Sequence, residues 1–411
     1  MQVFFIVDIA YLLALPFVVV HTIFSRLRGH PRRKDFLGRL GYGESLPPNG
    51  KRVLLHAVSV GEVNSLRTLV PLLSSEGYDV VICVTTDTGI DRARELYRSS
   101  CTVTRFPFDF SFAMRRFIKR INPNIVALVE LEVWPNFIGR CTTSSIPVVI
   151  VNGRLSQRSF KRYKLAKPLL RTTFSRISAI GMQNETYSQR VQSLGGKNVS
   201  VQGTMKWDNV VKDGDKIEGV NELAENLGIT RDKPLIVGAS TAPEEHALFR
   251  SALPEGAQLL CAPRKPEWFD EAEAVLSPCN RRTSNERHNT KFFLLDTIGE
   301  LDKAYALADL VIIGRSFVPM YGSDPTQPIA LGKPTFIGTN YSDFQEMVDL
   351  FEKENAIVVC KTNTLADTLT KFVKNDKLCS DAGSAGRAII ESQQGASRKY
   401  LELIMENTPS G

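Results

Sequence analysis

The sequence has little histidine and lacks closely spaced cysteines. Five histidines are scattered through 411 residues, and the seven cysteines stand far apart, with no CxxC pair. This spacing argues against a structural zinc site. An odd number of separated cysteines, several of them in apolar runs, is typical of reduced thiols that pack as small hydrophobic residues. The pattern therefore favours a cytoplasmic compartment for the folded body of the protein.

Two nucleotide-binding signatures are also missing, because neither GxGxxG nor GxxxxGK[ST] occurs. The sequence gives no support to a nicotinamide cofactor or a P-loop nucleotide, and we expect neither a cofactor nor a metal. The formal net charge is +7. Most of this excess lies in residues 25–40, so a nucleic-acid-binding surface spread over the fold is not expected.

The first apolar run covers residues 3–24 and is just long enough to cross a bilayer core at ~1.5 Å rise per residue. Basic residues follow the run instead of preceding it, which is unlike a signal peptide and places the rest of the chain in the cytoplasm. We expect residues 1–40 to attach the protein to a membrane, as a span or an interfacial helix, with the basic segment against anionic headgroups or lipid phosphates. A buried core helix is the alternative that Asp8 favours.

Beyond residue 41, short apolar runs alternate with longer amphipathic stretches in two series. Continuous runs of valine, isoleucine and leucine are typical of strands buried on both faces, and strand–helix alternation indicates a parallel, doubly wound sheet. We predict an α/β protein with two Rossmann-like lobes facing a cleft, at residues 41–210 and 222–411, joined by a polar linker at 211–221. The predicted strands are residues 52–58, 79–86, 125–130 and 146–152, then 234–240, 257–262, 292–296, 310–314 and 335–338.

Glu62 opens the helix that follows the first predicted strand. An acid in this position has an ordinary explanation, because the helix dipole favours negative charge in the first turn. The junction of strand and helix is also where doubly wound sheets bind their ligands. A carboxylate there could therefore act as a general base toward an acceptor hydroxyl.

Glu130 and Glu132 end another predicted strand, and Trp134 follows them. Two residues apart on an extended chain, the two acids are expected to point to the same side. They could bind a sugar or tune the pKa of a neighbouring group. Equally, one of them could cap the helix that starts after Pro135.

Pro263 and Arg264 leave a strand of the second predicted lobe on a loop stiffened by proline. The planar guanidinium fork of Arg264 can bind two oxygens of a phosphate or carboxylate at once. A solvated basic loop is the alternative interpretation.

Two further loops of this lobe are candidates for ligand contacts. Residues 296–301 start a helix and could bind a base or ribose through their amides. The long irregular stretch 314–328 precedes another helix, and Gln327 in it could reach ribose hydroxyls. Asp324 has an alternative explanation there, since it could simply initiate that helix.

Taken together, these motifs resemble the bacterial Kdo transferases, which move 3-deoxy-D-manno-octulosonic acid (Kdo) from its CMP donor onto a lipid A precursor. The resemblance runs from the amino terminus to about residue 345. The matching segments are residues 56–62 (HAVSVGE), 130–136 (ELEVWPN), 152–156 (NGRLS), 203–208 (GTMKWD), 239–241 (AST), 263–264 (PR), 296–301 (DTIGEL) and 332–334 (GKP).

The resemblance implies a GT-B fold, an amino-terminal membrane anchor and an inverting displacement without metal. It implies that Glu62 is the general base, that CMP-Kdo is the donor, and that a lipid A precursor (lipid IVA) is the acceptor. Lipopolysaccharide core synthesis at the cytoplasmic face of the inner membrane would be the setting. The donor contacts implied by the resemblance are Pro263, Arg264, Ile298, Gly299, Glu300, Asp324, Pro325, Thr326 and Gln327.

The chain departs from the family in the second lobe. Where the family usually shows Gly-Gly-His-Asn-Pro-x-Glu-Pro, residues 321–328 read YGSDPTQP, so Gln327 replaces an acid and Asp324 an asparagine. Arg315 stands where a glycine is usual, and Lys265 where a histidine is usual. Loss of a charged hydrogen bond weakens nucleotide binding by about 1.5–3 kcal/mol.

These departures keep other functions open. One is a transferase of the same fold with an altered donor or acceptor, and another is a degenerate membrane-bound homologue without activity. The soluble nucleotide-sugar epimerases share the fold, but the apolar amino terminus argues against them.

Overall fold

The computed structural model describes residues 8, 9, 11, 13 and 35–409, and the chain divides into two compact units. Unit 1 comprises Met1–Asn209 together with Gln394–Gly411, and unit 2 comprises Val210–Gln393. Two predicted boundaries are therefore wrong. The predicted linker, residues 211–221, lies inside unit 2, and the end of the predicted second lobe belongs to unit 1.

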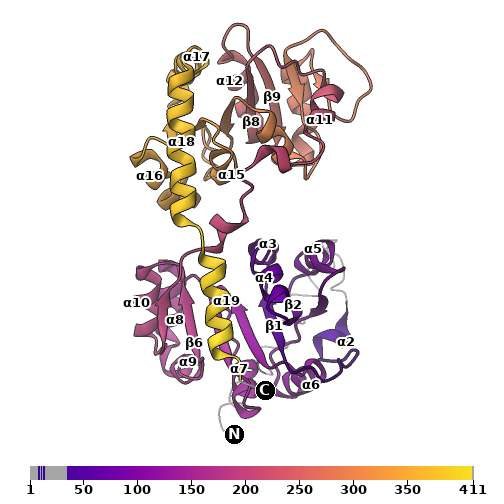
Figure 1. Cartoon of the computed structure of the whole chain (residues 1–411), viewed down its shortest axis with the longest axis vertical. Coiled ribbons are helices and arrows are strands. Elements are labelled where there is room, and N and C mark those ends of the chain that lie inside the picture. The colour runs from indigo at the N-terminus through magenta and orange to yellow at the C-terminus, as the bar shows by residue number, and fades with distance from the viewer. Residues whose placement is uncertain (1–7, 10, 12, 14–34, 410–411) are drawn as a thin grey trace. The chain divides into compact units, whose positions relative to one another are not determined.

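The carboxy-terminal helix explains the second correction. Helix α19 (Ala396–Asn407), yellow in Figure 1, packs against helix α4 (Leu69–Ser75) and strand β5 (Val148–Gly153) of unit 1. Its residues Tyr400, Leu401 and Ile404 are buried in the same hydrophobic core as Val53 and Leu55. An amphipathic pattern predicts a helix but does not specify which sheet the helix will cover.

Among the described residues, unit 1 contains a parallel sheet of seven strands in the order β3-β2-β1-β4-β5-β6-β7. The chain runs outward from β1 through β2 and β3, then returns to β4 on the other side of β1. The carboxyl ends of β1 and β4 therefore mark the switch point, where open parallel sheets bind ligands. The strands are β1 (Arg52–Ala57), β2 (Asp79–Val84), β3 (Thr102–Arg105), β4 (Ile125–Val129), β5 (Val148–Gly153), β6 (Ala179–Met182) and β7 (Val199–Val201).

Helices cover both faces of this sheet, so alternate residues of each strand enter different cores. Val53 and Leu55 pack with α3, α4, α5 and α19, whereas Leu54 packs with α6, α7 and α10. The helices of unit 1 before α19 are α2 (Phe36–Arg39), α3 (Val60–Ser65), α4 (Leu69–Ser75), α5 (Asp87–Tyr97), α6 (Ser111–Ile121), α7 (Pro135–Thr143), α8 (Gln157–Leu165), α9 (Lys167–Phe174), α10 (Glu185–Ser193) and the 3-10 turn η1 (Met205–Asn209).

Unit 2 repeats this plan, with described strands in the order β10-β11-β9-β8-β12-β13-β14 and a switch point between β8 and β12. Its strands are β8 (Leu235–Thr241), β9 (Gln258–Pro263), β10 (Asn280–Arg281), β11 (Phe292–Leu294), β12 (Leu310–Ile313), β13 (Thr335–Ile337) and β14 (Ile357–Val359). Its helices are α11 (Val220–Leu227), α12 (Pro243–Ser251), α13 (Phe269–Leu276), α14 (Leu301–Leu307), α15 (Thr326–Ala330), α16 (Gln345–Lys353), α17 (Leu365–Val373) and α18 (Asp376–Gln393), with 3-10 turns η2 (Gly214–Lys216), η3 (Pro266–Trp268), η4 (Ser342–Phe344) and η5 (Thr362–Thr364).

Each predicted strand is present, but the sequence patterns miss β3, β6, β7, β10 and β14. Four of these five lie at sheet edges, and β6 lies next to one. Edge strands are short and partly exposed, as in β3 and β7, and so lack the continuous apolar run that identifies central strands. The structure also divides the single helix expected after β1 into α3 and α4.

The predicted membrane anchor, residues 1–40, falls largely outside the described residues. Asp8, which is described, packs on unit 1: its Oδ1 accepts hydrogen bonds from the Ser111 N–H and from Asn136 Nδ2, each at 2.9 Å. The Tyr11 hydroxyl donates to Asp109 at 3.2 Å. In the described part of the chain, no helix combines the length and apolarity needed to cross a membrane.

Candidate functional site

Glu62 lies in the first turn of α3, directly after the switch-point strand β1. Ser59 is the N-cap residue: its hydroxyl accepts the Glu62 N–H at 3.4 Å and donates to Glu62 Oε1 at 2.9 Å. The Val58 N–H donates to Glu62 Oε2 at 2.8 Å. This arrangement resembles a capping box, so Glu62 does stabilise the helix start. It also fixes the carboxylate in one orientation, and each oxygen keeps further acceptor capacity.

The environment of Glu62 suits proton transfer. The residue is only 6% exposed. Burial raises the pKa of Glu62, and the charge of Glu130 raises it further, while hydrogen bonds from Val58 and Ser59 oppose the rise. A carboxylate with a raised pKa binds a proton more strongly, so in its ionised form it is a stronger base than an ordinary surface glutamate.

Two buried arginines lie behind the neighbouring loop, which follows β2. Arg39 is 6% exposed and Arg105 4%. Both pair with Asp87, at 3.5 Å and 2.7 Å, and Thr86 next to it donates a hydrogen bond to the Val58 carbonyl at 2.7 Å. Arg39 is the last residue of the basic segment predicted to meet lipid headgroups. For this residue the prediction is wrong, because its guanidinium is enclosed by the fold.

Glu130 and Glu132 follow β4, on the other side of the switch point from Glu62. Glu130 has φ +58°, so the chain is not extended there, and the alternation argument for a shared side fails. The three acids nevertheless influence one another. Burial raises the pKa of Glu132 to about 7, with further contributions from Glu62 and Glu130.

The Glu132 shift gives a pH prediction. A raised folded-state pKa means that the protonated acid stabilises the fold at low pH, and that this contribution is lost as the pH rises through about 7. We therefore expect Glu132→Gln to be more stable than the wild type at pH 8, by ~1–3 kcal/mol, with the difference nearly gone at pH 4, below the ordinary pKa of 4.5 that the unfolded chain has. Hydrogen exchange in a urea series, read on peptides of unit 1 at both pH values, measures this. The exposed Glu95→Gln is the control, and an equal difference at both pH values would contradict the prediction.

Neither Glu130 nor Glu132 caps α7, which was the alternative explanation for them. Asp109 does so: its carboxylate accepts the N–H groups of Asn136 at 3.1 Å and Phe137 at 2.8 Å. Glu130 and Glu132 therefore have no capping role at α7, and both remain candidates for the switch-point site.

Two basic residues, to which the sequence patterns assign no role, complete the charge balance of this site. Burial raises the pKa of Glu130, but the charges of Arg154 and Lys206 oppose that rise. Arg154 follows β5, and Lys206 lies in η1, which Asn152 holds by accepting the Met205 N–H at 3.1 Å. Arg154 directly follows a strand, whereas Lys206 lies in a 3-10 turn whose position in space no local pattern predicts.

His56, within the motif that ends in Glu62, lies in the interior instead of the site. It is fully buried, stacks on Phe106 with ring centroids 3.8 Å apart, and contacts the Cys83 carbonyl through Nδ1 at 3.3 Å. Burial lowers the pKa of His56 to about 3, so the ring is neutral and serves packing.

In unit 2, Pro263 ends β9 and Arg264 follows it at the carboxyl edge of the sheet. The Arg264 N–H donates to the Thr241 carbonyl at 3.0 Å, which anchors its backbone, and the side chain is exposed. The adjacent Lys265 pairs with Glu267 at 3.4 Å. Arg264 is therefore presented on an anchored loop with its guanidinium accessible to an anion.

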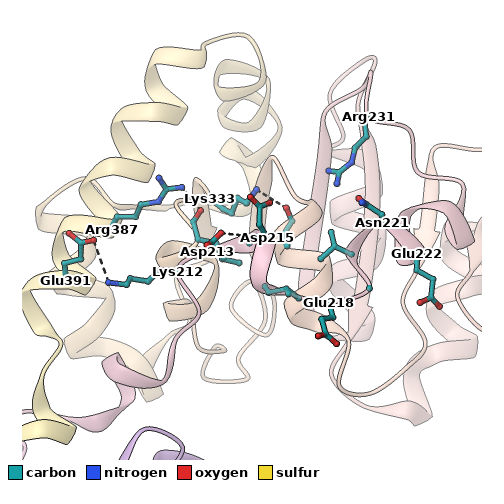
Figure 2. A pocket seen from close by; sticks show the side chains of 16 residues that line it. Lys212, Asp213, Asp215, Glu218, Asn221, Glu222, Arg231, Lys333, Arg387 and Glu391 are labelled. Atoms are coloured by element: carbon teal, nitrogen blue, oxygen red, sulfur yellow. Dashed lines mark hydrogen bonds and ion pairs between the residues drawn. The ribbon is translucent and has the colours of Figure 1, made fainter. Parts of the chain in front are cut away.

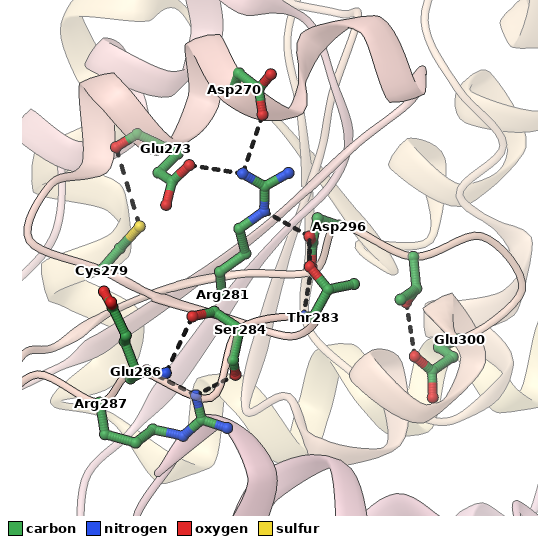
Figure 3. A network of polar contacts seen from close by, with 11 residues as sticks. Asp270, Glu273, Cys279, Arg281, Thr283, Ser284, Glu286, Arg287, Asp296 and Glu300 are labelled. Carbon is green, nitrogen blue, oxygen red and sulfur yellow. Dashed lines mark hydrogen bonds and ion pairs between the residues drawn. The ribbon is translucent and has the colours of Figure 1, made fainter.

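Figure 3 shows the network behind the next loop. Asp296 is 7% exposed and accepts hydrogen bonds from Arg281 Nε at 2.5 Å and from the Thr283 N–H at 3.0 Å. The same guanidinium also bonds Asp270 and Glu273. This network fixes the end of β11 and thereby the start of the loop 296–301.

Glu300, a predicted donor contact, already has partners. Burial would raise its pKa, but hydrogen bonds from neighbouring side chains, among them Lys303 at 2.8 Å and Arg282 at 3.2 Å, lower the pKa to about 2. Its neighbours are open: Ile298 is 70% exposed, and Gly299 has φ +95° with free space where a Cβ would lie. The accessible groups of this loop are therefore the backbone amides and the Ile298 side chain.

The altered loop before α15 is held by its own polar side chains. Asp324 Oδ1 accepts the Thr326 N–H at 2.9 Å and bonds the Thr326 hydroxyl, so Asp324 does initiate the helix. Gln327 Oε1 accepts the Val211 N–H at 3.1 Å, and Nε2 donates to the Val211 carbonyl at 2.8 Å. Both ends of the Gln327 amide thus bind the segment predicted to be a linker.

The structure also assigns a role to Glu245, which no sequence pattern singles out. Its fully buried carboxylate, on α12, accepts backbone N–H groups from Ala242 and from three successive residues after β12. One of these, Arg315, has φ +60°, a conformation that disfavours side chains. This explains why a glycine is usual at that position.

A family profile described as 3-Deoxy-D-manno-octulosonic-acid transferase (kdotransferase) matches residues 34–209. A glycosyltransferase structure from Rickettsia africae superposes with a TM-score of 0.60, covering 89% of this chain and all of that one. Its sequence identity is only 13%, so the match concerns the fold. The two doubly wound units are thus those of a GT-B protein, as predicted.

Two curated relatives extend over nearly the whole chain. The 3-deoxy-D-manno-octulosonic acid transferase of Bordetella pertussis is 28% identical, over 89% of this chain and 90% of that protein. The protein of the same name from Haemophilus influenzae is 30% identical, over 92% and 91%. Given this similarity, the chain belongs to the 3-deoxy-D-manno-octulosonic acid transferase family.

Proposed function

We propose that this protein transfers Kdo from CMP-Kdo to a lipid A precursor, as a step of lipopolysaccharide core synthesis. Family membership supports the sugar, since relatives named for transfer of this acid match about nine tenths of the chain. The observation that carries the chemistry is Glu62, a buried carboxylate held in one orientation at the switch point of unit 1.

In the proposed reaction, Glu62 accepts the proton of an acceptor hydroxyl while the new bond forms between the hydroxyl oxygen and the anomeric carbon. The bond from that carbon to the phosphate oxygen of the donor breaks, and CMP leaves. A single displacement of this kind inverts the configuration, and it draws no group from a metal. Arg264 would hold the departing phosphate through its planar fork.

The proposed setting is the cytoplasmic face of the inner membrane. The apolar run of residues 3–24 and the basic residues after it support attachment there. The acceptor is itself a membrane lipid, so an enzyme attached to that surface meets its substrate without extracting it.

A transfer assay with purified full-length protein tests the proposal. CMP-Kdo and a lipid A precursor, presented in detergent micelles, should yield CMP and a lipid carrying Kdo, detected by mass spectrometry. The same incubation with EDTA should proceed at an unchanged rate. Failure of the folded wild type to form the glycosylated lipid would sink the proposed function.

The donor loops give a second prediction. Arg264→Ala should weaken CMP binding about 10- to 150-fold, because a charged hydrogen bond to a phosphate is worth ~1.5–3 kcal/mol. Isothermal titration calorimetry measures the affinity. Arg287→Ala, at an exposed arginine whose guanidinium bonds carbonyls of its own loop, is the matched control and should bind CMP like the wild type. Wild-type affinity in Arg264→Ala would remove this residue from the donor site.

A transferase with altered nucleotide recognition is the second candidate, and Gln327 is the observation that favours it. Its amide both accepts from and donates to Val211, whereas a carboxylate, which only accepts, could not make the second bond. Titration of CMP against UDP separates the two candidates. Tighter binding of CMP supports the Kdo donor, and tighter binding of UDP supports the alternative.

A further inference from the structure

A cavity of about 810 Å³ lies in unit 2, at the amino-terminal ends of central strands. Arg231 precedes β8, Lys333 precedes β13, and both line the cavity together with Arg387 from α18 (Figure 2). The predicted donor loops all follow the carboxyl ends of strands β9, β11 and β12. The strands of this sheet are parallel, so the cavity opens at the opposite edge from those loops.

Three basic side chains of this cavity have backbone carbonyls, instead of carboxylates, as their partners. Arg387 Nη2 donates to the Leu331 carbonyl at 2.9 Å, Lys333 Nζ to that of Ala306 at 3.1 Å, and Arg231 Nη1 to that of Leu307 at 3.4 Å. Among the described residues, no carboxylate forms an ion pair with any of the three. Each guanidinium and the ammonium therefore keep donors for another acceptor.

The electrostatic interactions of Lys333 show that these charges lie close together. Burial lowers the pKa of Lys333, and the charges of Arg231 and Arg387 lower it further, while Asp309 opposes them. Like charges held together beside a half-buried lysine destabilise one another. A bound anion would relieve this repulsion.

Among the described residues, the acids that line the cavity form no ion pair with these three basic residues. Three of these acids already have basic partners: Glu391 with Lys212 at 3.8 Å, Asp213 with Lys216 at 3.8 Å, and Glu222 with Arg282 at 3.6 Å. Asp215 and Glu218 are exposed, as are Arg231 and Arg387, so water and salt screen these charges, and Lys333 is the partly buried member of the basic set.

The turn before β13 shapes this arrangement. Gly332 has φ +72°, and a Cβ there would come within 2.4 Å of the Arg387 guanidinium. Only glycine therefore lets Arg387 lie across the turn with Lys333 beside it. The Gly332-Lys333-Pro334 motif, for which the transfer reaction offers no use, thus builds one wall of the cavity.

We propose that this cavity is a second anion site, binding a phosphate-bearing ligand through Arg231, Lys333 and Arg387. Arginine forks pair with two phosphate oxygens at once, and a lysine ammonium adds a compact charge. The volume accommodates a group larger than inorganic phosphate alone. The site requires no contact with the donor loops and goes beyond the transfer reaction.

Titration of the full-length protein with inorganic pyrophosphate, with CMP present at saturation to fill the donor loops, tests the proposal. We expect one pyrophosphate per chain, bound at least ~10-fold more weakly by Arg387→Gln and with an intermediate loss by Arg387→Lys, which keeps the charge but not the planar fork. Arg231→Gln is a second variant. The hydrogen bond from Arg231 to the Leu307 carbonyl is long, at 3.4 Å, so its loss should affect the stability of the fold less than the loss of the Arg387 bond. Arg398→Gln, at an exposed arginine of α19 outside the cavity, is the matched control.

Unchanged pyrophosphate affinity in folded Arg387→Gln and Arg231→Gln, or no binding by the wild type, would overturn the proposal. Sedimentation with phosphatidylglycerol or phosphatidylcholine vesicles then distinguishes the source of the phosphate. If Arg387→Gln also loses retention on the anionic vesicles, the ligand is a lipid headgroup. If only pyrophosphate binding falls, the ligand is a soluble phosphoester.

Discussion

Replacing Glu62 with glutamine should lower the rate of Kdo transfer about 10³-fold, within the range that general-base catalysis contributes. The amide has nearly the same size and its oxygen can still accept the Val58 N–H, but it cannot take up the acceptor proton. The pKa of Glu62 is raised, so the wild-type rate should fall as the pH drops through that raised value, where the base becomes protonated. The variant should lose this part of the pH profile.

Glu62 also stabilises the start of α3, so a structural effect must be separated from a catalytic one. Glu95→Gln makes the same chemical change at an exposed residue of α5 and should leave transfer unchanged. CMP binding and urea unfolding of Glu62→Gln should stay close to the wild type. Transfer at the wild-type rate by this variant would remove Glu62 as the base.

Replacing Glu245 with alanine should destabilise unit 2 by about 3–5 kcal/mol, the usual cost of deleting one partner from a buried charged network. Four backbone N–H groups, one at the N-cap residue of α12 and three after β12, would lose their acceptor inside the fold. The chain has two units, so a global unfolding curve is ambiguous. Hydrogen exchange in a urea series, read on peptides of unit 2, measures the effect where it occurs.

Glu244 provides the matched control for this experiment. It directly precedes Glu245 in the first turn of α12, but its side chain is exposed. Glu244→Ala should therefore change the free energy of unfolding by no more than about 0.5 kcal/mol. A Glu245→Ala variant within 1 kcal/mol of the wild type would show that water replaces the lost acceptor.

The sequence was most informative where a local pattern has one physical explanation. Strands buried on both faces must be continuously apolar, so the central strands of both sheets could be predicted. Parallel sheets place their ligands at the carboxyl ends of strands, so Glu62 could be selected as a candidate. The family resemblance was needed to choose the base role over helix capping, and the structure shows that Glu62 caps the helix in any case.

The errors and omissions share a cause, which is dependence on partners far away in sequence. Glu245 is separated by 70 residues from the loop that it binds, and Asp109 by 27 from the helix that it caps. Gln327 is 116 residues from Val211. The local hydrophobic periodicity of a sequence does not predict hydrogen bonds between residues so far apart. The left-handed backbone at Glu130 likewise invalidates an argument that assumes an extended strand.

The path of the chain bears on how the protein folds as it is synthesised. Unit 2 is in effect an insertion within unit 1, because Gln394–Gly411 return to the first sheet. Tyr400, Leu401 and Ile404 belong to a core whose members outside α19 are translated about 200 codons earlier or more. Domains that are complete fold as they leave the ribosome. The inserted unit can therefore fold first. Until α19 has been synthesised, the apolar face of unit 1 that this helix covers stays exposed to solvent. A chaperone would be most useful during this period.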